Sequence, residues 1–253
     1  MGLIYFLDNG ILENTFMEID LEKEKNSDIN MGPSDMVEAG LHFGHRTSKI
    51  HPKMKPYIYT VKNGVHMLDL NKTKQKLNEA LEIIAKTIKE GNVLLLVGTK
   101  IQFKDLVKKI GQEANIPYIT RRWLGGTFTN FKTIKKRIDY FKELEDKKEK
   151  GELEKYTKKE RAKIDKEIQD LESKLGGIKN MDNLPEVVFI TSIIRDILAV
   201  KEAKKKGIKV IAIADTDADP SLADYIIPAN DDAISSVAYI LEKVKDAIIK
   251  NRA

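Results

Sequence analysis

The sequence predicts an α/β protein built on a doubly wound parallel sheet with helices on both faces. The first observation is that apolar runs typical of strands alternate with segments typical of helices through most of the chain. The second is that NVLLLVGTK, residues 92–100, contains a continuous apolar run that ends in a Gly-Thr turn, as expected of a strand buried on both faces. The third is the composition, because 253 residues of which 42% are hydrophobic suffice for one sizeable core.

The first predicted elements lie between residues 51 and 89. Residues 51–70 are expected to form an extended lead-in followed by a strand, with prolines and a glycine as breaks. Asn71 is the expected cap of a helix over 72–89. Apolar residues recur at spacings of three and four in that helix, namely Leu77, Ala80, Leu81, Ile84 and Ile88.

The alternation continues after the strand at 92–100. We expect helices over about 101–114, 195–206 and 232–250. Between them we expect strands in IPYIT (116–120), EVVFITS (186–192), KVIAIAD (209–215) and DYIIP (224–228). Strands that alternate with helices imply βαβ units, and therefore a parallel sheet covered on both sides.

Residues 132–175 interrupt this pattern as an insertion. They contain 15 basic and 12 acidic residues in 44 positions, which is too much charge for a core. Apolar residues still fall at spacings of three and four, in one set Ile134, Ile138 and Phe141, and in another Ile164, Ile168, Leu171 and Leu175. We predict an antiparallel coiled-coil hairpin of two helices over 132–175, with residues 32–131 and 176–253 forming the α/β domain.

Residues 1–31 differ from the remainder in charge. This segment holds two lysines and seven acidic residues, whereas the whole chain has a net charge of +5. We treat it as an acidic N-terminal extension and leave open whether it is disordered or a short helix that docks on a partner or on this protein. Cysteine is absent, and no apolar run approaches the roughly 20 residues of a membrane span, so we expect a soluble cytoplasmic protein.

The stretch TRRWLGGTFTN, residues 120–130, is the main candidate for function. No acidic residue lies between Glu113 and Asp139. Arginine side chains match phosphate oxygens, adjacent glycines allow close approach of backbone N–H groups, and Thr127 and Asn130 can donate to phosphate or ribose. We therefore predict binding of a polyanion here. The basic candidates are Arg121, Arg122, Lys132, Lys135, Lys136 and Arg137.

A second tract without acidic residues covers 42–62. Its candidate contacts to a polyanion are Arg46, Lys49, Lys53, Lys55 and Lys62. Two separated tracts favour an extended footprint. His42 and His45 have a spacing found in metal sites, but no carboxylate lies between Glu38 and Asp69 to complete such a site, so we expect no metal.

The two aromatic residues of the 120–130 stretch allow two interpretations. Trp123 and Phe128 can stack on unpaired bases. Alternatively, they pack between the base of the hairpin and the sheet, since most tryptophans are buried in the structure. Packing is the expectation we favour for both.

The most enzyme-like feature is ADTDADP at 214–220. Asp215 and Asp217 resemble the aspartate pair of haloacid-dehalogenase-type phosphohydrolases, in which the first aspartate attacks phosphorus and the pair helps to hold magnesium, with Asp231 and Asp232 as further ligands. Against this alternative, the pair comes late in the chain and no suitably placed lysine motif is present. The structural alternative is that Asp215, Asp217 and Asp219 cap a turn.

Several longer stretches resemble a known family. They include AGLHFGHRTSKIHPKMKPYI, NGVHMLDLNKT, RRWLGGTFTNFKTIKKRI, LGGIKNMDNLP and DYIIPANDDAISS. In this order they resemble the second protein of the small ribosomal subunit in its bacterial or organellar form, over about residues 34–250. The resemblance implies a flavodoxin-like sheet that carries a coiled-coil hairpin, and a structural role on the ribosome without catalytic residues or a cofactor.

The resemblance also implies partners and roles. The partners are small-subunit ribosomal RNA and neighbouring ribosomal proteins, including the large messenger-binding one, with no membrane and no small-molecule substrate. Carried over to this chain, the charged residues of both basic tracts are expected to touch RNA. Trp123, Gly125 and Gly126 are expected to shape the loop. The N-terminal extension is a candidate for meeting the messenger-binding partner.

Overall fold

The chain folds around a parallel sheet of five strands. A computed structural model describes residues 32–252, so the acidic extension predicted at 1–31 lies outside the described residues. The sheet order is β5-β4-β6-β7-β8, and every neighbouring pair is parallel. Counted along the chain this is the order 2-1-3-4-5 of flavodoxin-like folds, which confirms the predicted doubly wound α/β sheet. The strands are β4 Leu94–Val97, β5 Tyr118–Ile119, β6 Val187–Ile190, β7 Lys209–Ala214 and β8 Tyr225–Pro228.

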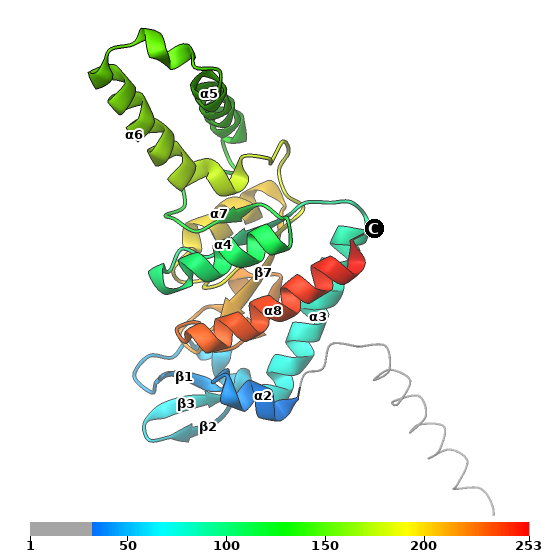
Figure 1. Cartoon of the computed structure of the whole chain (residues 1–253). Coiled ribbons are helices and arrows are strands. Elements are labelled where there is room, and N and C mark those ends of the chain that lie inside the picture. The colour runs from blue at the N-terminus through cyan, green and yellow to red at the C-terminus, as the bar shows by residue number, and fades with distance from the viewer. Residues whose placement is uncertain (1–31, 253) are drawn as a thin grey trace, which may run out of the picture. The chain divides into compact units, whose positions relative to one another are not determined.

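Helices cover both faces of this sheet. Helix α8 (Ile234–Asn251) lies between α3 (Leu70–Lys89) and α4 (Lys104–Glu113) (Figure 1). Helix α7 (Ile197–Lys206) packs on β7, and its residues Ala199 and Val200 belong to the same buried cluster as Val188 of β6. The neighbouring strand residue, Val187, points to the other face because strand side chains alternate, and it is also buried.

A separate antiparallel sheet precedes α3 and corrects one prediction. It has the order β1-β3-β2, with β1 Phe43–Arg46, β2 Ile58–Lys62 and β3 Val65–Leu68. The single strand expected within 51–70 was therefore wrong, because β2 and β3 form a hairpin there. Asn63 and Gly64 both have positive φ, 52° and 74°, which is the backbone that a two-residue hairpin turn requires.

The predicted cap of α3 was also wrong. The helix begins at Leu70, and Asp69 is its N-cap, since its carboxylate accepts the backbone N–H groups of Asn71 and Lys72. Asn71 lies inside the first turn. The Asp69 side chain satisfies two free N–H groups of this turn. The helix therefore begins directly after Asp69 and before the predicted cap, Asn71.

Two helices occupy the region predicted as an insertion. They are α5 (Phe131–Glu149) and α6 (Lys158–Leu175), joined through the short 3-10 helix η3 (Glu152–Lys155), and they lie side by side (Figure 1). Thr157 and Glu160 form a capping box at the start of α6. Both helices bury one side, α5 with Ile138, Phe141 and Leu144, and α6 with Ile168, Leu171 and Leu175.

The remaining short elements are α2 (Pro33–Glu38) and the 3-10 helices η1 (Pro52–Tyr57), η2 (Ile101–Phe103), η4 (Gly176–Ile178) and η5 (Pro220–Leu222). Across residues 32–252, no helix has the length and apolar character needed to cross a membrane.

Candidate RNA-binding surface

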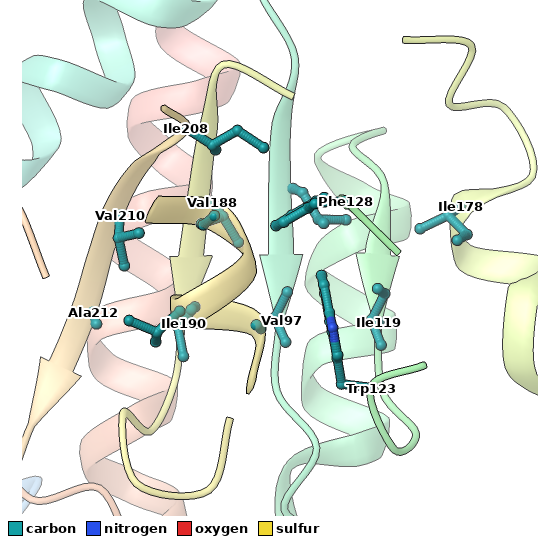
Figure 2. Close-up of a cluster of buried hydrophobic side chains, with 14 of the residues drawn as sticks. Val97, Ile119, Trp123, Phe128, Ile178, Val188, Ile190, Ile208, Val210 and Ala212 are labelled. Carbon is teal, nitrogen blue, oxygen red and sulfur yellow. The ribbon is translucent and has the colours of Figure 1, made fainter. Parts of the chain in front are cut away.

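The loop from Thr120 to Asn130 connects β5 to α5 and is built around two buried rings. Trp123 and Phe128 are 5% and 0% exposed, and their ring centroids are 4.8 Å apart in an edge-to-face arrangement. Figure 2 shows both rings beside Val97 and Ile119 in the cluster that fills this face of the sheet. Because neither ring is exposed, neither offers a free face on which a base can stack.

A single buried carboxylate on α7 holds the loop in shape. Glu202 Oε1 accepts hydrogen bonds from Trp123 Nε1 at 3.2 Å and from the Gly126 amide at 2.7 Å. Its Oε2 accepts from the amides of Phe128 and Thr129, at 3.0 and 3.1 Å, and from the Thr129 hydroxyl at 3.2 Å. Five donors thus converge on one side chain that is 6% exposed.

These hydrogen bonds keep Glu202 charged. Burial alone would raise the pKa of its carboxyl group, but the amides of Gly126, Thr129 and Phe128 and the Trp123 indole together lower the pKa below its usual value. Sequence reasoning missed this residue, because it predicted a helix over 195–206 and assigned none of its side chains to the loop. The available signal was its position, since Glu202 follows the buried Ala199 by three residues and so lies on the same side of the helix.

The polar and glycine residues of the loop differ in what they do. Gly126 has a φ of +93°, which favours glycine, whereas a Cβ atom at Gly125 would be in ordinary contact with Leu198 at 3.9 Å. Thr127 is 1% exposed and donates its hydroxyl to the Leu124 carbonyl oxygen at 2.6 Å. Asn130 is exposed at the N-cap of α5, where its side-chain oxygen accepts from the Thr133 hydroxyl at 2.9 Å.

The predicted cations around this loop lie on the loop itself and on the first two turns of α5, which follows it. We call this region the loop–α5 surface, and it consists of Arg121, Arg122, Lys132, Lys135, Lys136 and Arg137. The Lys135 ammonium group donates to the carbonyl oxygen of Asp182 at 3.1 Å and lies 3.4 Å from the Asp182 carboxylate. Arg137 lies over the Tyr140 ring, 5.7 Å from its centroid. Within residues 32–252, Lys135 is the one cation of this surface with an acidic partner within 4 Å.

The second basic tract lies elsewhere in the fold. Arg46 and Lys62 end β1 and β2 of the small sheet, and Figure 1 shows that sheet at the opposite end of the parallel sheet from α5 and α6. Lys53 is engaged, with its ammonium group 3.3 Å from the Asp219 carboxylate and 2.7 Å from the Ser221 hydroxyl. Lys49 and Lys55 are exposed. The structure therefore does not bring the two tracts together.

The aspartates at the carboxyl end of the parallel strands are engaged within the chain. Asp215 is 1% exposed, and its two oxygens meet the Thr216 amide and His45 Nδ1, the latter at 3.1 Å. His45 Nε2 lies 3.6 Å from Asp217. A nucleophile needs an exposed oxygen, so this arrangement gives the phosphohydrolase alternative no support.

Neighbouring charges at this edge are also paired. The Lys100 ammonium group lies 2.8 Å from Asp231 and 2.9 Å from Asp232. The Asp219 side chain caps η5 by accepting the Ser221 amide, as the turn-capping interpretation expects. In the part of the chain that the structure describes, no group of three or more His, Asp or Glu side chains is arranged to hold a metal ion.

Comparison with known proteins points to a single family. The profile of the family described as Ribosomal protein S2 matches residues 36–251. Small ribosomal subunit protein uS2 of Roseiflexus sp. (strain RS-1) is 48% identical over 217 residues, covering 86% of this chain and 83% of that protein. The protein of the same name from Roseiflexus castenholzii is also 48% identical, with 86% and 82% covered. That of Coprothermobacter proteolyticus is 42% identical, with 86% and 81% covered.

Proposed function

Because the chain belongs to the ribosomal protein S2 family, we propose that it binds small-subunit ribosomal RNA through its loop–α5 surface. The protein is a structural component of the small ribosomal subunit and not an enzyme. In this proposal it acts by neutralising phosphate charge and by shape, as part of ribosomes in the cytoplasm.

One observation carries the proposal. Arg121 and Arg122 are exposed and adjacent, on a loop whose backbone is fixed from inside by Glu202. A guanidinium group held on a rigid loop loses less freedom when it contacts phosphate than one on a mobile segment. Lys132, Lys136 and Arg137 extend the same positive surface along the first turns of α5. Thr127 is left out of the proposed contacts because its hydroxyl is used inside the protein.

The α5 and α6 pair extends this proposal. We infer that these helices form an antiparallel coiled-coil arm whose basic residues follow the RNA from the loop outward. The support is the pairing of two narrow apolar sides, since Ile138 and Phe141 of α5 and Ile168 and Leu171 of α6 share one buried cluster. Some charged residues of these helices are paired, such as Lys148 with Asp165, whereas exposed Lys136 and Lys166 have no acidic partner within 4 Å in the described part of the chain.

Two further contacts are predictions from the family resemblance. Arg46, Lys49, Lys55 and Lys62 of the small sheet would form a second RNA contact, separate from the loop–α5 surface. Lys53 would join it only by leaving Asp219 and Ser221. The large messenger-binding protein of the subunit stays a predicted partner. The test is to measure the affinity of that protein for the full chain and for the chain without residues 1–31.

The test is RNA binding by the full chain as a function of salt. The Arg121→Ala/Arg122→Ala variant should bind a small-subunit ribosomal RNA transcript more weakly. Each lost phosphate contact should also reduce the slope of log affinity against log salt by about one. A variant with the wild-type slope would show that these arginines do not contact phosphates. A wild-type chain that never sediments with small subunits would contradict the proposed function as a whole.

A further inference from the structure

A basic pocket lies beside Arg121, between α4, the end of β5 and the last turns of α6. Its volume is about 260 Å³. The residues that matter for its charge are Lys104 and Lys108 of α4, Arg121, and Glu172 and Lys174 of α6. Of these, only Arg121 was among the predicted RNA contacts. We call this cavity the α4–α6 pocket.

The pocket has a wall fixed by close packing. Tyr118 lines it, and a Cβ atom on Gly111 would lie 2.3 Å from the Tyr118 ring. A Cβ atom on Gly177 would lie 2.1 Å from the Tyr118 carbonyl oxygen and 2.7 Å from the ring. The ring is therefore held between two glycines, one on α4 and one on η4, and any larger residue at either position would displace it. The close packing of α4, β5 and η4 around this ring therefore fixes one wall of the pocket.

The charge of the pocket is unbalanced. It has four cations and one carboxylate, that of Glu172. Glu172 turns back toward the end of its own helix, where its carboxyl carbon lies 2.6 Å from the position of a Cβ atom on Gly176. Within residues 32–252, none of the four cations makes a hydrogen bond or an ion pair at 4 Å or less. Such a group of unpaired cations around a cavity attracts an anion.

We propose that the α4–α6 pocket binds a phosphate group of the ribosomal RNA backbone and continues the loop–α5 surface past Arg121. This inference rests on the proposed RNA-binding function. Arg121 lines the pocket and also begins the loop–α5 surface, so one RNA strand can meet both sites. Lys108, Arg121 and Lys174 are exposed, which suits a polymer that passes over the opening. The pocket offers no buried cation of the kind that would enclose a small free anion.

Three variants of the full chain test the pocket against RNA and against inorganic phosphate. Lys104→Gln/Lys108→Gln removes two of its cations. Glu172→Gln removes its one carboxylate. Lys205→Gln/Lys206→Gln is the matched control, because these exposed lysines end α7 next to the start of β7, which lies three strands from β5 in the sheet. The probes are a small-subunit ribosomal RNA transcript at several salt concentrations, and inorganic phosphate as a competitor.

The proposal expects opposite effects from the two pocket variants. Lys104→Gln/Lys108→Gln should reduce the salt slope by about one to two, while the control keeps the wild-type slope. Glu172→Gln should tighten RNA binding about two- to fivefold, as expected on removing a repulsive charge from a surface site. Both results support the pocket.

Other results overturn it in distinguishable ways. If RNA binding by the wild type depends steeply on salt and the pocket variants show the same dependence, the pocket does not bind RNA phosphate. The proposed function would then still stand. Inorganic phosphate that binds the wild type but not Lys104→Gln/Lys108→Gln, with RNA binding unchanged, would assign the pocket to a free anion instead. A wild type without salt-dependent RNA binding would overturn the proposed function and this inference together.

Discussion

Glu202 is the residue on which the shape of the RWLGGTFTN loop depends. Its carboxylate accepts from three backbone amides, one indole and one hydroxyl, so it replaces the hydrogen bonds that a loop would otherwise make with water. The loop can therefore turn back over the sheet with Trp123 inside the core. The arginines beside this tryptophan are left on the outside.

Replacing Glu202 with glutamine should destabilise the protein. The amide group of glutamine brings two N–H donors and only one acceptor oxygen to a site that presents donors, so at least one buried donor loses its partner. We expect the free energy of unfolding to fall by about 2 to 4 kcal/mol in urea denaturation. Glu82→Gln is the control, since Glu82 is an exposed residue of α3 and this change should cost well under 1 kcal/mol. Equal stability of the two variants would contradict the role given to Glu202.

The limit of sequence reasoning is visible at these same residues. Burial of Trp123 was the favoured expectation because most tryptophans are buried, whereas its partner lies 79 residues further along the chain. No local pattern links Trp123 to Glu202. The role of Glu202 becomes evident only in the fold, where α7 lies against the loop.

The small antiparallel sheet is fastened to the parallel sheet through His45 and Thr216. The His45 amide donates to the Thr216 hydroxyl at 2.9 Å, and the His51 amide donates to the Thr216 carbonyl oxygen at 2.8 Å. Gly44 lies so close that a Cβ atom there would be 2.5 Å from the Thr216 methyl group. The imidazole of His45 adds contacts to Asp215, Asp217 and Asp232.

This link should make stability depend on pH. The Asp215 carboxylate, more than the charges of Asp217 and Asp232, raises the pKa of His45 from 6.5 to about 9 despite partial burial. The folded state therefore holds a proton that the unfolded state releases between these pH values, so stability is full below about pH 6.5 and falls as the pH rises to about 9. We expect a loss of about 1 to 3 kcal/mol, moderated by solvent because the side chain is 20% exposed.

The check is urea denaturation at several pH values between 6 and 9.5, for the wild type and His45→Gln. The variant should be less stable at pH 6 and should show a shallower decline over this range. A decline of the same steepness in both proteins would mean that another group causes it.

Elements with strong periodicity were predicted well, and those set by short turns were not. The parallel strands and their helices were found because buried runs and amphipathic spacing extend over many residues. The hairpin of β2 and β3 was missed, although Asn63-Gly64 is a turn pair, because the proline-rich segment before it suggested an extended chain. The cap of α3 was misplaced by two residues, since Asp69 and Asn71 are both good capping residues.

At the scale of the described part of the chain, the predicted cations lie at two separate places. The loop–α5 surface and the α4–α6 pocket lie together, because Arg121 belongs to both. The cations of the small sheet lie at the other end of the parallel sheet (Figure 1). From the sequence, both tracts were visible as stretches without acids, but the pocket was not, since its cations come from 104, 108, 121 and 174 and meet only in the fold.

Crosslinking from defined positions in assembled small subunits tests the central claim most directly. A photoreactive side chain at position 122 samples the loop–α5 surface, and one at position 205 samples the far end of α7. The account predicts that position 122 crosslinks to small-subunit ribosomal RNA and that position 205 does so far less. Crosslinks from position 122 that reach only proteins, or that match those from position 205, would contradict it.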